Sequence, residues 1–139
     1  MAEHTTHRRS QWGPVTVRPD DPRYGDLARR GSRRFSGKPD YVQLVGSTGQ
    51  VVEAVQDAVR KQLRVAVRSG GHCLEAFVAD PAVRVVIDTS LMSGLYYDSQ
   101  MGAFAIEAGA RLGEAYRTLF LGWGVTIPAG VSPNVGIGM

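Results

Sequence analysis

The stretch RVAVRSGGHC, residues 64–73, places a histidine directly after a β-branched run and two glycines. Glycine allows the backbone to adopt positive φ and to approach a bulky ligand closely. Successive small residues after a strand can turn backbone N–H groups inward, which makes a concave site for an anion. His72 adds a nucleophilic, titratable ring at the same point. The stretch favours a pyrophosphate over a metal ion, and the alternative interpretation is a tight turn with an exposed histidine.

A second glycine-rich stretch, PAGVSPNVGIG, occupies residues 128–138. It contains neither the GxxxxGK[ST] pattern of a P-loop nor the GxGxxG dinucleotide fingerprint. Residues 109–115, GARLGEA, have the order glycine turn then helix but also lack the fingerprint spacing, so they predict a plain strand-to-helix turn. None of these stretches identifies a ligand by itself.

The elements that must position these stretches begin with a strand-helix-strand unit. Residues 41–45 predict a strand, and residues 46–63 predict an amphipathic helix that opens with Ser47 and Gln50 at capping-box spacing. The run RVAV, residues 64–67, predicts the next strand. A right-handed crossover of this kind makes the two strands parallel. The Pro-, Gly- and charge-rich residues before this unit predict loops around one short helix.

The second half of the chain changes character. Short β-rich runs at residues 83–90, 94–98 and 103–110 predict an antiparallel meander. Apolar residues at helical spacing predict a helix over 112–123, ended by one of the nearby glycines. A last strand is expected from Val125, followed by the glycine-rich loop. The pattern as a whole predicts an α+β fold.

Composition bounds the classes of function. The chain has 139 residues, 43% of them hydrophobic and 21% charged, which is typical of one globular domain. The net charge of +3 is too small to argue for nucleic acid or an anionic membrane, and the basic run Arg29–Arg34 follows three aspartates, which predicts a mixed-charge surface. The single cysteine excludes an internal disulfide. We expect a cytoplasmic protein, because no apolar run long enough to span a membrane and no secretory signal are present.

The two ends of the chain carry separate expectations. Residues 1–16 are expected to be a disordered tail, and residues 17–139 a domain. His4 and His7 stand at i, i+3, but a polar tail is not expected to hold a metal. The closing loop has no later element to pack on it, so we expect the N-terminal part of a longer protein, inactive as the 139-residue piece.

The order of four stretches resembles the FAD-linked oxidases of the vanillyl-alcohol oxidase and berberine bridge enzyme type. RSGGH is followed about 60 residues later by PAGVSPNVGIG, with VVIDTSLM and AIEAGARLGE between them. The resemblance covers Val17 to Met139 and looks nearest to oxidases that tailor sugar-bearing or polyketide natural products. It implies a PCMH-type FAD-binding domain with two subdomains. One would be a small parallel βαβ layer through about Val67, and the other an antiparallel sheet with helices from about Val83, with FAD between them.

The resemblance also implies roles for individual residues. His72 would bond covalently to the flavin 8α-methyl group. Ser132 stands where many relatives carry a cysteine that bonds flavin C6, and because a hydroxyl is a far weaker nucleophile, we expect no second link. Cys73 is expected to face away from the ligand of His72, and Met139 stands where relatives often have glycine. The residues implied to contact FAD are Arg68, Ser69, Gly70, Gly71, His72, Cys73, Phe77, Met92, Pro128, Gly130, Ser132, Val135, Gly136 and Gly138.

The implied activity is oxidation of a small molecule, with oxygen as acceptor and no metal. The oxidised group would be an alcohol, such as a sugar or natural-product hydroxyl, or an amine. The residues that activate the substrate are expected beyond residue 139. Two alternatives stay open: a dehydrogenase of the same fold with FAD not covalently bound, and a non-catalytic module that binds a nucleotide or a partner. Asp88, at the end of a predicted strand, is interpreted as a turn or cap residue rather than a general base.

Overall fold

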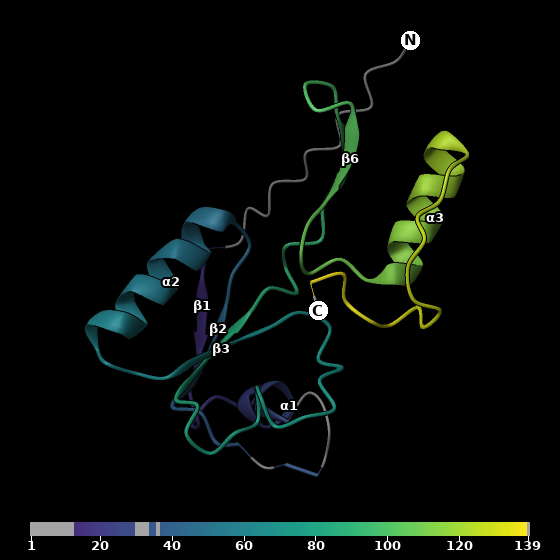
Figure 1. Cartoon of the computed structure of the whole chain (residues 1–139). Helices are drawn as coiled ribbons and strands as arrows, with labels where there is room; N and C mark the ends of the chain where they lie inside the picture. Colours follow the sequence, from purple (N-terminus) through teal and green to yellow (C-terminus); the bar gives the residue numbers. More distant parts are fainter. Residues whose placement is uncertain (1–12, 30–33, 36, 139) are drawn as a thin grey trace.

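The computed structural model describes residues 13–29, 34–35 and 37–138. A four-stranded sheet flanked by two helices forms one part, and a two-stranded ribbon with a third helix forms the other (Figure 1). This arrangement confirms the α+β class. The elements are β1 (Val15–Val17), α1 (Tyr24–Ala28), β2 (Tyr41–Leu44), α2 (Thr48–Arg60), β3 (Val65–Arg68), β4 (Val85–Asp88), β5 (Leu95–Asp98), β6 (Ala103–Ile106) and α3 (Leu112–Trp123).

The four-stranded sheet has the order β1-β2-β4-β3. β4 pairs in parallel with both β2 and β3, and β1 pairs antiparallel with β2. The expectation that an antiparallel layer starts at about Val83 is therefore wrong. Val85–Asp88 is buried at every position, which is typical of a central parallel strand covered on both faces. β2 and β3 run in the same direction, as the βαβ prediction requires, but β4 lies between them.

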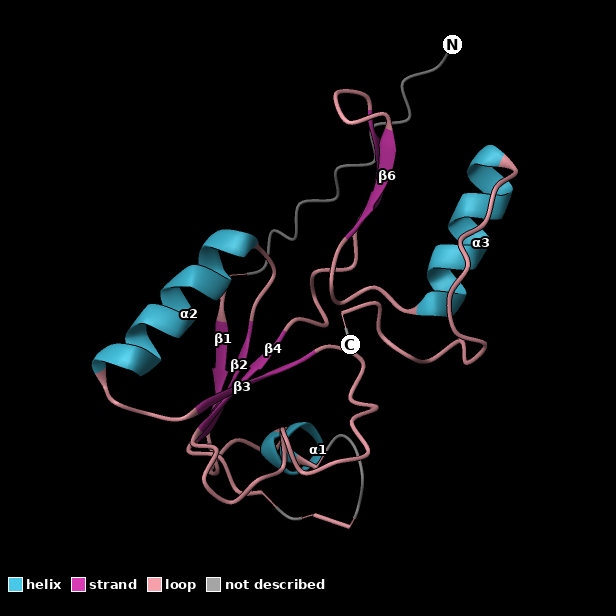
Figure 2. Ribbon diagram, in the orientation of Figure 1, coloured by secondary structure: helices cyan, strands magenta, loops and turns pink. Residues whose placement is uncertain are grey.

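Alternate residues of β4 pack on opposite faces of the sheet, as the two-residue period of a strand requires. Val85 and Ile87 belong to the core cluster beneath α2, and Val86 belongs to the cluster that includes Leu27 of α1. The capping prediction is confirmed, because the Ser47 hydroxyl accepts a hydrogen bond from the Gln50 amide at 3.3 Å. Figure 2 shows α2 along one face of the sheet and α1 near one end.

The second part is held together by aromatic contacts. β5 and β6 pair antiparallel, as predicted. Phe104 of β6 makes edge-to-face contacts with Tyr97 of β5 and with Trp123 of α3, at centroid distances of 5.2 and 5.0 Å. These contacts join the ribbon to α3, which ends at Gly124 in the left-handed conformation (φ 67°).

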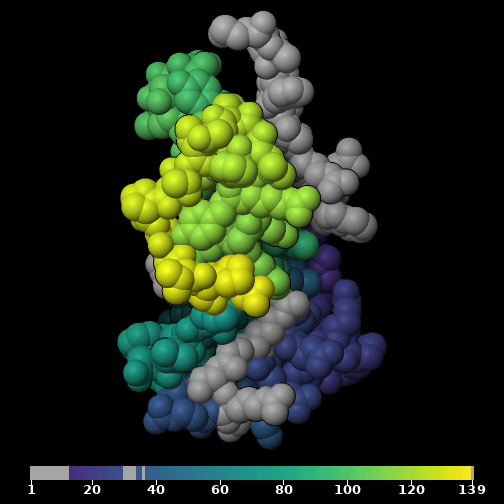
Figure 3. All heavy atoms as spheres, turned by 90° about the vertical axis from the view of Figure 1, so that its right-hand side faces the viewer, coloured from purple at the N-terminus to yellow at the C-terminus, as the bar shows by residue number. Residues whose placement is uncertain are grey.

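The strand expected from Val125 is not found, because residues 125–138 form a loop that runs back along α3 (Figure 3). Pro128 and Pro133 lack the N–H group that strand pairing uses. The loop bonds to α3 instead: the Tyr116 hydroxyl donates to the Gly130 carbonyl oxygen at 2.5 Å, and the Gly113 amide donates to the Pro133 carbonyl oxygen at 3.0 Å.

Val15 and Thr16, which were expected to belong to the tail, form β1 together with Val17. The interpretations placed on His4, His7, residues 30–33 and Met139 lie outside the described residues. None of the helices in the described part of the chain has the length and apolar character needed to cross a membrane.

The central position of β4 predicts a large effect of truncating its core side chain. Ile87→Ala should lower the free energy of unfolding by about 2–5 kcal/mol, because Ile87 is fully buried beneath α2. Val67→Ala is the matched control, since Val67 is the register partner of Ile87 on β3 but is 55% exposed, and its effect should stay within about 1 kcal/mol. Urea unfolding of the 139-residue chain measures both, and equal losses would contradict the assigned core.

Candidate functional site

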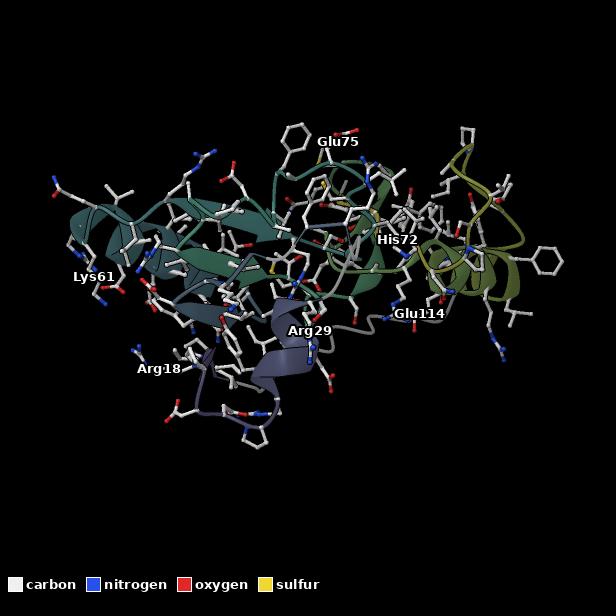
Figure 4. The ribbon with its side chains drawn as sticks, turned by 90° about the horizontal axis from the view of Figure 1, so that it is seen from below. Arg18, Arg29, Lys61, His72, Glu75 and Glu114 are labelled. Carbon is white, nitrogen blue, oxygen red and sulfur yellow. The ribbon has the colours of Figure 1, made fainter. Side chains whose placement is uncertain are left out.

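A cavity of about 690 Å³ lies where the segments after β3 and β4 meet the start of α3. Figure 4 labels His72 and Glu114, which line this cavity from the β3 segment and from α3. Five residues of the first glycine-rich stretch, 64–73, line the cavity together with residues from two further segments. The lining residues are Ser69, Gly70, Gly71, His72, Cys73, Leu74, Ser90, Ser93, Gly109, Arg111 and Glu114.

The loop after β3 has the geometry of an anion-binding turn. Gly71 adopts φ 77°, the left-handed conformation that favours glycine. Within the described part of the chain, the N–H groups of Gly70, Gly71 and His72 donate no hydrogen bond to protein acceptors. The backbone of this cavity-lining turn therefore carries N–H groups that have no protein acceptor and can serve an anionic group.

The two glycine-rich stretches touch, as expected. A Cβ atom added to Gly70 would collide with the backbone nitrogen of Gly136, and one added to Gly136 would collide with the Ser69 hydroxyl. The Ser69 hydroxyl donates a hydrogen bond to the carbonyl oxygen of Ala108. The closing loop therefore supports the β3 loop from behind through backbone contacts that only glycine permits.

The stretch GARLGEA forms the turn from β6 into α3, as predicted, and it is also part of the cavity wall. Gly109 packs so closely on the preceding turn that an added Cβ would collide with the Thr89 carbonyl oxygen and lie 2.7 Å from the Met92 carbonyl oxygen. This contact brings Arg111 and Glu114 to the cavity. Both are exposed, and no carboxylate pairs with Arg111 among the residues that the structure describes. The sequence did not indicate Arg111 and Glu114 as site residues, because GARLGEA lacks the GxGxxG spacing by which a dinucleotide site is usually found.

Arg68 does not line the cavity with its side chain, in contrast to the role that the resemblance implies. Its side chain is 2% exposed and is bound to Asp88, whose side chain is fully buried. Nε and Nη2 of Arg68 donate to Oδ2 of Asp88 at 3.0 and 2.7 Å. Oδ1 of Asp88 accepts from the Ser90 amide at 2.9 Å, so Asp88 is a turn residue, as interpreted, and also an ion-pair partner.

Other residues implied to contact FAD lie elsewhere. Met92 packs in the core beneath α2, and the Phe77 side chain is exposed. Cys73 lines the same cavity as His72, in contrast to the expectation that it faces away from the site, and residues 72–74 do not form the strand on which that expectation depended. Its thiol donates to the Glu75 carbonyl oxygen at 3.0 Å. The implied contact residues of the closing loop do not line the cavity: Pro128, Gly130, Ser132, Val135, Gly136 and Gly138.

The chemistry of the lining fits an anionic organic ligand. Free backbone donors and the Arg111 guanidinium supply positive polarity, and the His72 ring supplies a nucleophilic nitrogen. Within the described ranges, no three His, Cys, Asp or Glu side chains lie close enough to hold a metal ion.

Replacing Gly109 by alanine should damage the cavity wall. The added Cβ meets backbone atoms that cannot turn aside, so Gly109→Ala should lower the free energy of unfolding by about 1–3 kcal/mol. Gly122→Ala is the matched control, because nothing lies within 4 Å of its added Cβ inside α3, and it should raise stability by about 0.5–1 kcal/mol. Urea unfolding distinguishes the two, and stabilisation by both substitutions would contradict the close packing of Gly109.

Comparisons with known proteins identify the family to which the chain belongs. Residues 39–138 match the family described as FAD binding domain. The chain is 60% identical over 119 residues to aclacinomycin-N/aclacinomycin-A oxidase of Streptomyces galilaeus, covering 85% of this chain and 22% of that protein. It is 32% identical over 121 residues to hexose oxidase of Chondrus crispus, again 85% of this chain and 22% of that protein.

Solved structures agree as well. A glycopeptide hexose oxidase complexed with teicoplanin superposes with a TM-score of 0.88 at 57% identity, over 91% of this chain and 26% of that one. A berberine bridge enzyme-like protein of Physcomitrella patens superposes with a TM-score of 0.81 at 28% identity, over 90% of this chain and 27% of that one. The chain thus spans about a quarter of the length of these relatives. It belongs to the family of FAD-binding domains found in berberine bridge enzyme-like oxidoreductases.

Proposed function

We propose that the protein is an FAD-dependent oxidase that holds its flavin covalently through His72. Its substrate is a small molecule with an oxidisable alcohol, on a sugar or a glycosylated natural product, and oxygen is the electron acceptor. The observation that carries the proposal is the single cavity that gathers the free N–H groups of residues 70–72, the His72 ring and Arg111. Family membership supplies the identity of the cofactor.

The cavity fits the charged part of FAD. A pyrophosphate carries negative charge and accepts several hydrogen bonds, which matches the successive N–H groups of Gly70, Gly71 and His72. Arg111 adds a guanidinium without a carboxylate partner among the described residues, and such a group binds phosphate oxygens well. These residues would hold the dinucleotide by charge and backbone donors rather than by a fingerprint motif.

His72 is the residue that would hold the flavin covalently. Its side chain lines the cavity at the end of the glycine loop and makes no hydrogen bond within the described part of the chain. A neutral imidazole offers a nitrogen lone pair at neutral pH. Bound FAD would supply two-electron oxidation of the substrate and pass the electrons to oxygen. The covalent link would keep that group in the cavity through repeated turnovers.

The similar proteins support an alcohol as the substrate of this protein. The chain is similar to an aclacinomycin oxidase, a hexose oxidase and a carbohydrate oxidase of Microdochium nivale, the last at 30% identity over 102 residues. Similarity to (R)-6-hydroxynicotine oxidase, which suggests an amine, is lower at 26% identity. The higher identities therefore favour the oxidation of a sugar or natural-product hydroxyl.

The covalent link predicts flavin that stays on the protein after denaturation. Holoprotein precipitated in acid should keep its yellow flavin fluorescence, and His72→Ala should lose it. Cys73→Ala is the matched control, because Cys73 lines the same cavity and should not affect retention. Acid-stable flavin in His72→Ala would overturn the assignment of the anchor, and complete release from the wild type would favour a dehydrogenase with dissociable FAD.

Ser132 predicts that the link is single. A serine hydroxyl is a weak nucleophile at neutral pH, so peptide mapping by mass spectrometry should find a flavin adduct on the His72 peptide and none on the Ser132 peptide. Ser132→Cys introduces a thiol with an ordinary pKa near 8.5 and should gain a second adduct in the full-length protein. A flavin adduct on wild-type Ser132 would contradict the nucleophile argument.

A further inference from the structure

A buried ion pair lies directly behind the cavity and has no role in the proposed chemistry. Arg68 is the last residue of β3 and Asp88 is the last residue of β4, and the two are register partners in the sheet. Their side chains are 2% and 0% exposed. Ser69 and Ser90, which follow them closely in the chain, line the cavity. The pair therefore joins the two strands at the point where both chains enter the cavity wall.

The same two residues begin a series of hydrogen bonds through the cavity wall. The Arg68 carbonyl oxygen accepts from the Thr89 amide at 2.9 Å and from its hydroxyl at 3.3 Å. The Thr89 carbonyl oxygen accepts from the Met92 amide at 2.8 Å, and the Met92 carbonyl oxygen accepts from the Gly109 amide at 2.8 Å. A shift of β3 against β4 would therefore displace the turn after β4 and the segment that leads to Arg111.

The pair is poorly built for stability alone. Both hydrogen bonds from Arg68 go to one carboxylate oxygen, and Nη1 of Arg68 is buried without a partner among the described residues. An unsatisfied buried donor is unfavourable, and apolar side chains of similar volume often replace a buried ion pair with no loss of stability. Unlike apolar contacts, however, a charged pair with directional bonds selects one relative position of the two strand ends.

We propose that Arg68 and Asp88 are positioning residues: their ion pair fixes the end of β3 against the end of β4, so that loop 69–73 and turn 89–92 take the spacing that receives the FAD dinucleotide. The identity of the ligand rests on the proposed function. The positioning itself rests on the geometry of the pair and its hydrogen bonds. Arg68 acts here through the loop that follows it and does not touch the cofactor.

The test replaces the pair by apolar residues in the double variant Arg68→Met, Asp88→Val. The chain offers a matched control in Arg84 and Asp40, an exposed pair in which Nε and Nη2 of Arg84 donate to the two carboxylate oxygens at 3.0 and 2.6 Å. Arg84 directly precedes β4, so the control pair lies at the opposite end of that strand. The control variant is Arg84→Met, Asp40→Val.

Three quantities are measured on each protein: the urea midpoint, amide hydrogen exchange by NMR, and the dissociation constant for FAD by flavin fluorescence. The dissociation constant is measured with His72→Ala added to each protein, so that no covalent link forms. In the variant Arg68→Met, Asp88→Val, the amides of Thr89, Met92 and Gly109 should exchange at least about tenfold faster than in the wild type, because local opening exposes them without global unfolding. The amide of Val85, which donates to the Arg64 carbonyl oxygen at 3.1 Å, should keep its rate, and so should the urea midpoint. The FAD dissociation constant should rise by at least about tenfold, whereas the control should leave FAD binding and the Thr89, Met92 and Gly109 amides unchanged.

A second variant, Arg68→Lys, decides the question if the double variant does not fold. Lysine keeps the charge but loses the planar fork, so the same three amides should exchange faster than in the wild type. Wild-type exchange rates in a folded double variant would overturn the positioning role, and so would wild-type rates in Arg68→Lys. If the wild type binds no FAD, the proposed function fails, and the exchange rates still decide whether the pair positions the cavity wall.

Discussion

β4 has hydrogen-bonded neighbours on both of its edges, and the position of the cavity depends on that pairing. Because β2 and β3 run parallel to β4, the carboxyl ends of all three strands lie at one edge of the sheet. Ligands of open parallel sheets commonly bind outside this edge, where connecting segments leave the strands. Here β3 sends loop 69–73 and β4 sends turn 89–92 from that edge, and both line the cavity. The rest of the site is built on these two segments.

The second constraint is backbone contact between segments distant in sequence. Gly70 lies against Gly136, and Gly109 lies against the carbonyl oxygen of Thr89, with no room for a Cβ atom at any of these glycines. Such contacts bring whole segments closer than side chains would allow, and they leave backbone groups rather than side chains on the cavity wall. This explains how a site without a fingerprint motif still presents several N–H donors at one place. It also explains why so many of the implied contact residues are glycines.

Local patterns predicted the elements well and their partners poorly. The Ser47 cap, a glycine at the end of the helix over 112–123 and the meeting of the two glycine-rich stretches were all predicted, because each depends on short-range chemistry or on one shared ligand. The insertion of β4 between β2 and β3 was not, since an apolar run fits a parallel or an antiparallel strand equally well. The burial of Arg68 follows from that insertion, because its partner Asp88 is a neighbour only when β4 lies beside β3.

The cavity holds two nucleophilic side chains, and their surroundings differ in a way that favours the imidazole. The Cys73 sulfur lies 3.0 Å from the Glu75 carbonyl oxygen and donates its hydrogen there. A thiol reacts as the thiolate, so attack by Cys73 requires that this hydrogen bond be broken and the proton removed. His72 makes no hydrogen bond within the described residues, and an imidazole nitrogen that carries no proton has a lone pair able to form a bond. The imidazole can therefore turn toward a ligand without losing a hydrogen bond, which supports the proposal that His72, rather than its neighbour Cys73 on the same cavity wall, holds the flavin.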